Sequence, residues 1–80
     1  LYILSMSPRQ EVTNQVRRHR RLQDMTQQEL ADRIGVTRPT VLSVERGRYN
    51  PSVGLALRMA EVFGVSVEAL FEIDRGGGND

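Results

Sequence analysis

The most constraining stretch of the chain is the twenty residues QQELADRIGVTRPTVLSVER, from Gln27 to Arg46. Gly35 stands where a first helix must stop, because glycine readily adopts the left-handed backbone that ends a helix sharply. The small side chain of Ala31 lets a second helix approach closely, and Val36 is expected to fill the angle between the two. The apolar and small residues recur at helical spacing on both sides of the glycine: Leu30, Ala31, Ile34, Val36, Val41 and Val44. The stretch therefore predicts two short helices that cross at a steep angle.

Capping residues agree with this interpretation. Thr26 and Glu29 are three residues apart and predict a capping box at the start of the first helix. Thr37 is the expected N-cap of the second helix, and Pro39 lies in its first turn, where the missing N–H would have no partner. Gly47 is expected to end that helix.

Two short helices joined by a glycine turn form the helix-turn-helix motif that reads DNA. The alternative is an ordinary pair of amphipathic helices in a small bundle. Such a pair would rarely place a small residue, a turn glycine and the core aliphatics in all of these positions. The pattern therefore favours double-stranded DNA as the partner.

Composition sets outer limits. Eighty residues are enough for one domain with a small core. The absence of cysteine excludes disulfides and thiolate metal sites and fits a reducing cytoplasm. Apolar runs are too short to span a membrane and no signal-peptide pattern is present, so we expect a cytoplasmic protein with no membrane partner. The start LYIL lacks an initiator methionine; one interpretation is that residues 1–5 were added ahead of a natural start at Met6.

The net charge of +1 conceals two halves of opposite sign. From Arg9 to Arg48, nine arginines face five acidic residues, an excess of four positive charges. From Tyr49 onward, two arginines face five acidic residues, an excess of three negative charges. This asymmetry suggests a polyanion-binding face opposite a solvated or partner-facing one.

An opening helix is predicted from Glu11 to Gln23, with arginines crowding its surface. Its inner face and its end are apolar apart from one histidine, and comprise Val12, Val16, His19, and either Leu22 or Met25.

A fourth helix is predicted from its N-cap Ser52 through Phe63, and Gly64 ends it. Its expected core residues are Leu55, Leu57, Met59, Ala60 and Phe63. Ser66 begins a short fifth helix, VEALFEI. The expected fold class is therefore all-α, a five-helix domain over residues 11–74, with an N-terminal extension (1–10) and a flexible tail (75–80).

The segment from about Val12 to Ile73 resembles the Cro/phage-repressor type of helix-turn-helix domain, the Xre-like regulators. The matching pieces are TQQELADRIGVTRPTV, VERGRYNPS and ALRMAEVFGVSVEALF. The resemblance implies a five-helix repressor-like domain, sequence-specific operator binding as a transcriptional repressor, and a homodimer. Two positions depart from the family pattern: His19 stands where an aliphatic residue is usual, and Pro39 where glutamine is frequent.

The outward face of the second motif helix is expected to meet the bases, because Val41 and Val44 face inward. Arg38 projects from the N-terminal end and can fork onto guanine, with a phosphate contact as the alternative. Leu42 can contact a thymine methyl, or can be a partly packed surface leucine. The predicted base contacts are Arg38, Pro39, Leu42 and Ser43.

Phosphate contacts are expected around this helix. Gln27 stands at a helix N-terminus, where free N–H groups and the helix dipole suit a phosphate, and the resemblance implies the same role. The other predicted phosphate contacts are Gln28, Thr37, Thr40, Arg46, Arg48 and Asn50. The resemblance further implies that Arg20 pairs with Glu45, which would remove Glu45 from base reading. The remaining arginines of the opening helix, Arg17, Arg18 and Arg21, are more often solvated than DNA-facing in such a position.

The sequence gives little indication of catalysis. We expect that the protein is not an enzyme and that it binds no cofactor and no metal ion. One histidine and no cysteine cannot form a nucleophile pair or a zinc ligand set. Glu29 and Asp32 are expected to be solvated on a helix surface, and His19 to be a packed residue.

Two other functions use the same domain. An antitoxin would need a surface for a toxin, and a bridging module would bind another protein without reading DNA. The candidate protein-binding surface is Val65, Val67, Leu70, Phe71 and Ile73, with LYIL as an addition, although these residues could simply complete the core. For a homodimer, the expected interface is Leu70, Phe71 and Ile73, which exceed what so small a core can bury.

Overall fold

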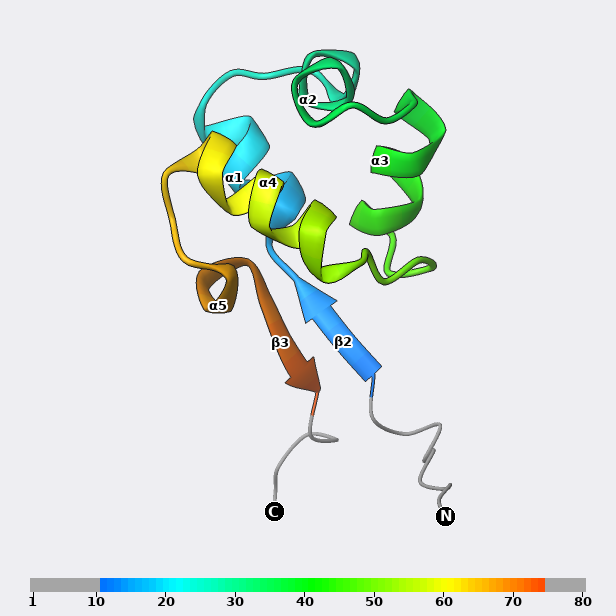
Figure 1. Cartoon of the computed structure of the whole chain (residues 1–80), viewed down its shortest axis with the longest axis vertical. Coiled ribbons are helices and arrows are strands. Elements are labelled where there is room, and N and C mark those ends of the chain that lie inside the picture. Colours follow the sequence, from blue (N-terminus) through cyan, green and yellow to red (C-terminus); the bar gives the residue numbers. More distant parts are fainter. Residues whose placement is uncertain (1–10, 75–80) are drawn as a thin grey trace.

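The structure, a computed structural model, describes residues 11–74 (Figure 1). The expectations for residues 1–10 and 75–80 lie outside this range. The elements in chain order are β2 (Glu11–Asn14), α1 (Val16–Leu22), α2 (Gln27–Ile34), α3 (Arg38–Glu45), α4 (Val53–Phe63), α5 (Val67–Leu70) and β3 (Phe71–Asp74). All five predicted helices are therefore present in the described part of the chain. No helix in that part is long and apolar enough to cross a membrane.

Local side-chain chemistry fixes the helix ends, largely as predicted. The Thr26 hydroxyl accepts a hydrogen bond from the Glu29 backbone N–H at 3.0 Å, and the Glu29 carboxylate accepts one from the Thr26 N–H at 2.7 Å, which completes the capping box. Gly35 ends α2 in the left-handed conformation at φ +75°. Thr37 is the N-cap of α3 by position, but its hydroxyl lies 3.1 Å from that of Thr40 and makes no capping hydrogen bond.

The core forms where the helices meet. Its buried residues are Val16, Met25, Leu30, Ala31, Ile34, Val41, Val44, Leu55, Met59, Ala60, Phe63 and Leu70. The prediction for Leu57 is wrong, because α4 turns its Leu55–Met59 face inward and leaves Leu57 55% exposed. At the end of α1, Leu22 is exposed and Met25 closes the core. His19 is packed, as expected, with its ring centroid 5.9 Å from that of Phe63.

The two ends of the domain differ from the prediction, because they pair with each other. Residues 11–14 form a strand instead of the first turn of a helix, and residues 71–74 form a strand instead of the end of α5. The strands are antiparallel, with Val12 opposite Ile73 and Asn14 opposite Phe71. The helical class is confirmed, with a two-stranded sheet added to it.

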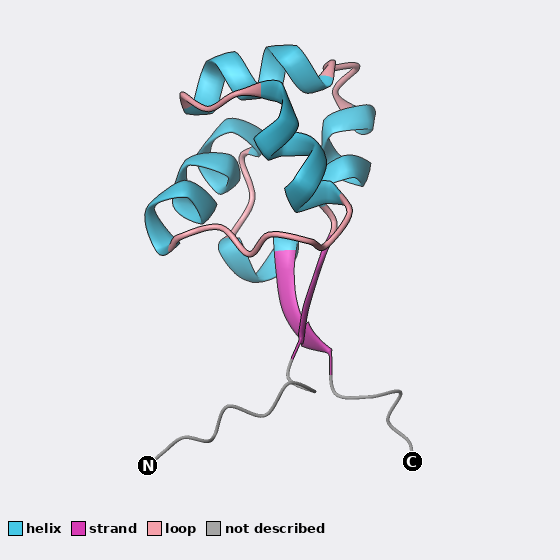
Figure 2. Ribbon diagram, turned by 90° about the vertical axis from the view of Figure 1, so that its right-hand side faces the viewer, coloured by secondary structure: helices cyan, strands magenta, loops and turns pink. Residues whose placement is uncertain are grey.

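Asn14 shows why the first helix begins late. Its side-chain oxygen accepts a hydrogen bond from the Val16 N–H at 3.1 Å, and its amide donates to the Val44 carbonyl at 2.8 Å. The Gln15 N–H donates to the Leu70 carbonyl at 2.8 Å. These contacts hold the chain as a strand up to Asn14 and tie it to α3 and α5. Figure 2 shows the resulting arrangement, in which the sheet projects from one end of the helical cluster.

Candidate nucleic-acid interface

Helix α3 presents one face to the core and the other outward. Val41 and Val44 are fully buried, whereas Arg38 and Pro39 are exposed at the N-terminal end of the helix. Leu42 and Ser43 are half-buried on the outward side. The four residues predicted to contact bases therefore lie on the part of α3 that faces away from the core.

A buried ion pair links α1 to the end of α3. The Arg20 Nε donates to Glu45 Oε2 at 2.6 Å, and its Nη2 donates to Glu45 Oε1 at 3.2 Å. The Arg20 Nη1 also donates to the Met25 carbonyl at 2.8 Å. The Arg20 and Glu45 side chains are only 10% and 3% exposed, so water does little to screen the pair. The pairing implied by the resemblance is confirmed, and it occupies both carboxylate oxygens of Glu45.

Gln27 joins the same network. Its Nε2 donates to Glu45 Oε1 at 3.1 Å, and its side chain is half-buried at the N-terminus of α2. A carboxylate only accepts hydrogen bonds, so the amide nitrogen must face Glu45. That nitrogen keeps a second N–H, which can donate outward. The neighbouring Gln28 donates instead to Asp32, one turn along its own helix, at 2.9 Å.

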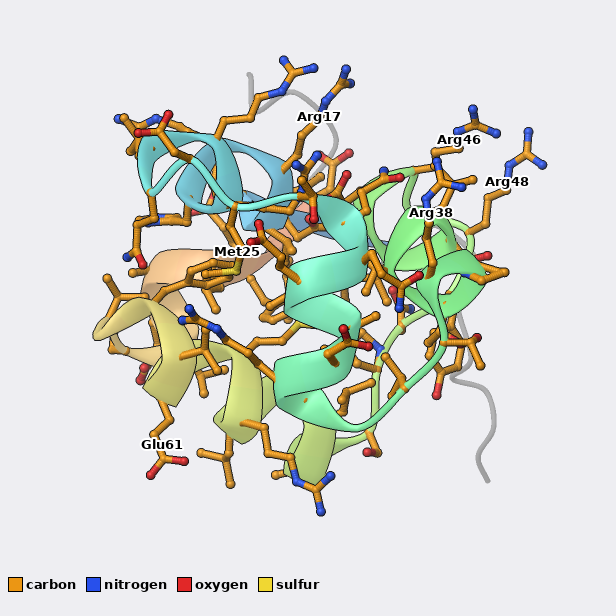
Figure 3. The ribbon with its side chains drawn as sticks, turned by 90° about the horizontal axis from the view of Figure 1, so that it is seen from above. Arg17, Met25, Arg38, Arg46, Arg48 and Glu61 are labelled. Atoms are coloured by element: carbon orange, nitrogen blue, oxygen red, sulfur yellow. The ribbon has the colours of Figure 1, made fainter. Side chains whose placement is uncertain are left out.

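The predicted phosphate contacts lie at the N-terminal ends of α2 and α3 and just beyond the C-terminal end of α3. Thr37 and Thr40 pair at its N-terminal end. Arg46, Arg48 and Asn50 are exposed just beyond its C-terminal end. In Figure 3, Arg38, Arg46 and Arg48 extend to the same side of the molecule.

Arg17 also extends to that side, from α1 (Figure 3). An open recess of about 330 Å³ between α1, α2 and α3 is lined by Arg17, Gln27, Arg38, Leu42, Glu45 and Arg46. From its sequence alone, Arg17 is expected to be a solvated arginine. Its position could have been inferred from Arg20, which is one helical turn further along α1. Because Arg20 pairs with Glu45, that side of α1 must face α3.

The expected dimer residues lie differently from the prediction. Leu70 is fully buried in the core of its own chain and is not accessible to a partner. Phe71 is half-buried and Ile73 is 45% exposed, and both lie on β3 instead of on a helix. Among the described residues, no group of histidine and acidic side chains could hold a metal ion.

An outward helix with an arginine at its N-terminal end, held by a glycine turn against a second helix, defines a DNA-binding helix-turn-helix domain. Comparisons with known proteins agree. The helix-turn-helix family model matches residues 16–70. A helix-turn-helix-type transcriptional regulator of Methanothermobacter thermautotrophicus is 46% identical over 63 residues, which cover 78% of this chain and 91% of that protein. Another, from Methanocaldococcus jannaschii, is 41% identical over 58 residues, covering 72% and 88%.

Among solved structures, the restriction–modification controller protein C.AhdI of Aeromonas hydrophila matches with a TM-score of 0.65 and 29% identity. The match covers 69% of this chain and 83% of that protein. The chain belongs to the Xre-like helix-turn-helix family of transcriptional regulators.

Proposed function

We propose that this chain represses transcription by binding a two-fold operator in double-stranded DNA as a homodimer. The observation that carries the proposal is the outward face of α3. There Arg38 has no hydrogen-bond or ion-pair partner among residues 11–74, while Glu45, the one acidic residue of the helix, is neutralised by buried Arg20. A cation that reads DNA must not be neutralised by a nearby carboxylate. Because Arg20 already neutralises Glu45, the charge of Arg38 remains available to DNA. Repression requires only occupancy of the operator, whereas activation requires a further surface for the transcription machinery.

Base reading is assigned to the outward face of α3. Arg38 would donate two hydrogen bonds to the O6 and N7 atoms of guanine in the major groove. Leu42 and Pro39 would contact thymine methyl groups, because neither side chain can hydrogen-bond. Ser43 can donate or accept and would discriminate weakly.

Phosphate contacts would hold the domain in register on the duplex. Gln27 would use the N–H that Glu45 leaves free, together with the N-terminal backbone of α2. Arg46 and Arg48 would neutralise phosphates beyond the other end of α3. Smaller contributions would come from Gln28, Thr37, Thr40 and Asn50.

Two copies are needed because one recognition helix reads only about four or five base pairs, too few to specify a site in a genome. The proposed dimer surface is the apolar side of the sheet, Phe71 and Ile73, together with the groove beside it. That groove, of about 210 Å³, is lined in part by Val12, Val53 and Val67. Val53 lines this groove and is 77% exposed, so a partner could cover its side chain.

Selection of bound sequences from a random DNA pool tests the proposal in one step. We expect an enriched site with dyad symmetry and half-site centres about 10 base pairs apart, close to one DNA turn of roughly 34 Å. An enriched site without a dyad would overturn the homodimer. A pool with no enrichment would overturn DNA reading and favour the protein-bridging function.

A further inference from the structure

We infer that the DNA-binding surface continues from the helix-turn-helix onto α1, where Arg17, Arg18 and Arg21 bind the phosphate backbone of one DNA strand. These three residues form the α1 strip. The inference rests on the proposed DNA-binding function and extends it to residues outside the motif.

The shape of the surface connects α1 to the reading helix. The recess between α1 and α3 is lined by Arg17 and Glu45, among others. A second open recess, of about 570 Å³, runs along α1 and is lined by the same two residues together with Arg18 and Arg21. Since the two recesses share Arg17 and Glu45, they form one furrow that leads from α3 to α1.

The furrow carries positive charge with almost no compensation. Five arginines border it: Arg17, Arg18, Arg21, Arg38 and Arg46. Its one acidic residue, Glu45, is 3% exposed and already paired with Arg20. That pair is the one salt bridge found within residues 11–74, so none of the five bordering arginines is paired there.

Two features of the α1 strip are unfavourable for the helix that carries it. Helix α1 has the sequence VRRHRRL, with no acidic residue in its first turn. Arg17 and Arg21 are four residues apart, so their charges repel on one face. Arg17 and Arg18 also stand in the first turn, where the helix dipole disfavours positive charge. A bound polyanion would relieve both repulsions.

A DNA backbone suits this surface better than an acidic protein does. In Figure 3, Arg17 extends to the same side as Arg38, Arg46 and Arg48, so a duplex seated on α3 would lie alongside it. Successive phosphates along a strand form a regular row of charges that a continuous furrow can follow. Arginine guanidinium groups can also bind phosphate oxygens in pairs.

Salt dependence of binding to the selected DNA site measures these contacts. Each arginine that neutralises a phosphate adds about 0.9 to the slope of log affinity against log salt. The triple variant Arg17→Gln, Arg18→Gln, Arg21→Gln should therefore lose about two to three units of slope for each bound subunit, about five for a dimer on its two-fold site. Its affinity should fall on all sequences alike, with the base preference unchanged. Hydroxyl-radical footprints should shorten at the flank of each half-site.

Arg33→Gln is the matched control for Arg17→Gln, because Arg33 is an exposed helix arginine that lines neither recess. Both changes remove one charge, so only a local contact makes their slopes differ. Glutamine and arginine have similar helix propensity, so α1 should persist, and the single variants keep the test valid if the triple variant unfolds.

If the triple variant and Arg17→Gln keep the slope of the Arg33→Gln protein, the inference is wrong. Should the wild type bind DNA with base preference in that case, the proposed function stands. A wild-type protein that binds no DNA would instead remove the proposed function itself.

Discussion

The helix-turn-helix and the β2–β3 sheet are held together in contrasting ways. Leu30, Ile34, Val41 and Val44 of α2 and α3 are at most 1% exposed, so packing between side chains fixes that unit. In the sheet, four residue pairs join the two strands, while the β3 residues after Phe71 are exposed. The sheet therefore depends mainly on its backbone ladder and on few apolar contacts.

The contrast matches the two tasks proposed for these units, base reading and dimer formation. A rigid reading unit must hold Arg38 in a fixed position, because base readout depends on hydrogen-bond geometry. A partner surface must instead leave apolar side chains accessible, as Ile73 is. Asn14 connects the two units, since it ends β2 and donates to the Val44 carbonyl of α3. We expect substitutions in the first unit to act on folding or base choice, and substitutions in the second to act on assembly.

Breaking the buried pair should have the largest effect. The Glu45 side chain is only 3% exposed, so Arg20→Ala leaves a buried carboxylate without its cation. We expect this to lower the free energy of unfolding by about 3–5 kcal/mol. Urea unfolding at neutral pH measures this. The control is Arg33→Ala, an exposed helix position that should change stability by no more than about 0.5 kcal/mol.

A double variant sharpens the same test. Replacing both partners, as Arg20→Met with Glu45→Leu, removes the buried charges together and should recover much of the lost stability. A loss below about 1 kcal/mol for Arg20→Ala alone would show that the pair does not hold α3 in place.

The helix-turn-helix was predictable because its determinants are local. Thr26 with Glu29, and Gly35 and Gly64, act within one turn of the residues that they cap. The sheet was not predictable in this way, because Thr13 meets Glu72 across 59 residues of sequence. The spacing of Val12 and Val16 is also that of a helix face, so the periodicity pointed to the wrong element.

The residues of the candidate site show the same difference between local and long-range determinants. The outward position of Arg38 follows from the inward valines of its own helix. The position of Arg17 beside the α3 recess depends instead on how α1 lies against α3, which neighbouring residues in the sequence do not reveal.

The second prediction concerns Arg38→Ala, a substitution that should change base reading without disturbing the core. Arg38 is exposed, so Arg38→Ala should leave folding almost unchanged. It should weaken binding to the preferred site by about 1–3 kcal/mol and relax the choice at one base pair per half-site. Titration of the variant against the preferred site and against an unrelated duplex checks both points. Equal weakening on the two duplexes would make Arg38 a phosphate contact.

The third prediction separates two kinds of phosphate contact at opposite ends of α3. Arg46→Ala removes one charge per subunit and should lower the salt slope by about 0.9 for each subunit bound, about 1.8 for a dimer. Gln27→Ala removes a hydrogen bond without a charge, so it should weaken binding and leave the slope unchanged. Affinity measured over a series of salt concentrations distinguishes them. A wild-type slope for Arg46→Ala would exclude Arg46 from the phosphate contacts.

A substitution in the sheet, Ile73→Asp, should have the smallest effect on folding. Its main effect should be the loss of the dimer. Ile73 is 45% exposed, so Ile73→Asp should keep the helical circular dichroism signal and change stability by no more than about 0.5 kcal/mol. A charge at a two-fold interface meets its own copy, so the variant should sediment as a monomer and bind one half-site weakly. Leu22→Asp is the matched control, because Leu22 is also an exposed aliphatic residue but ends α1 and does not line the groove beside the sheet. If Leu22→Asp dissociates the dimer and Ile73→Asp does not, the partner surface lies at the end of α1, and the sheet serves only to close the ends of the domain.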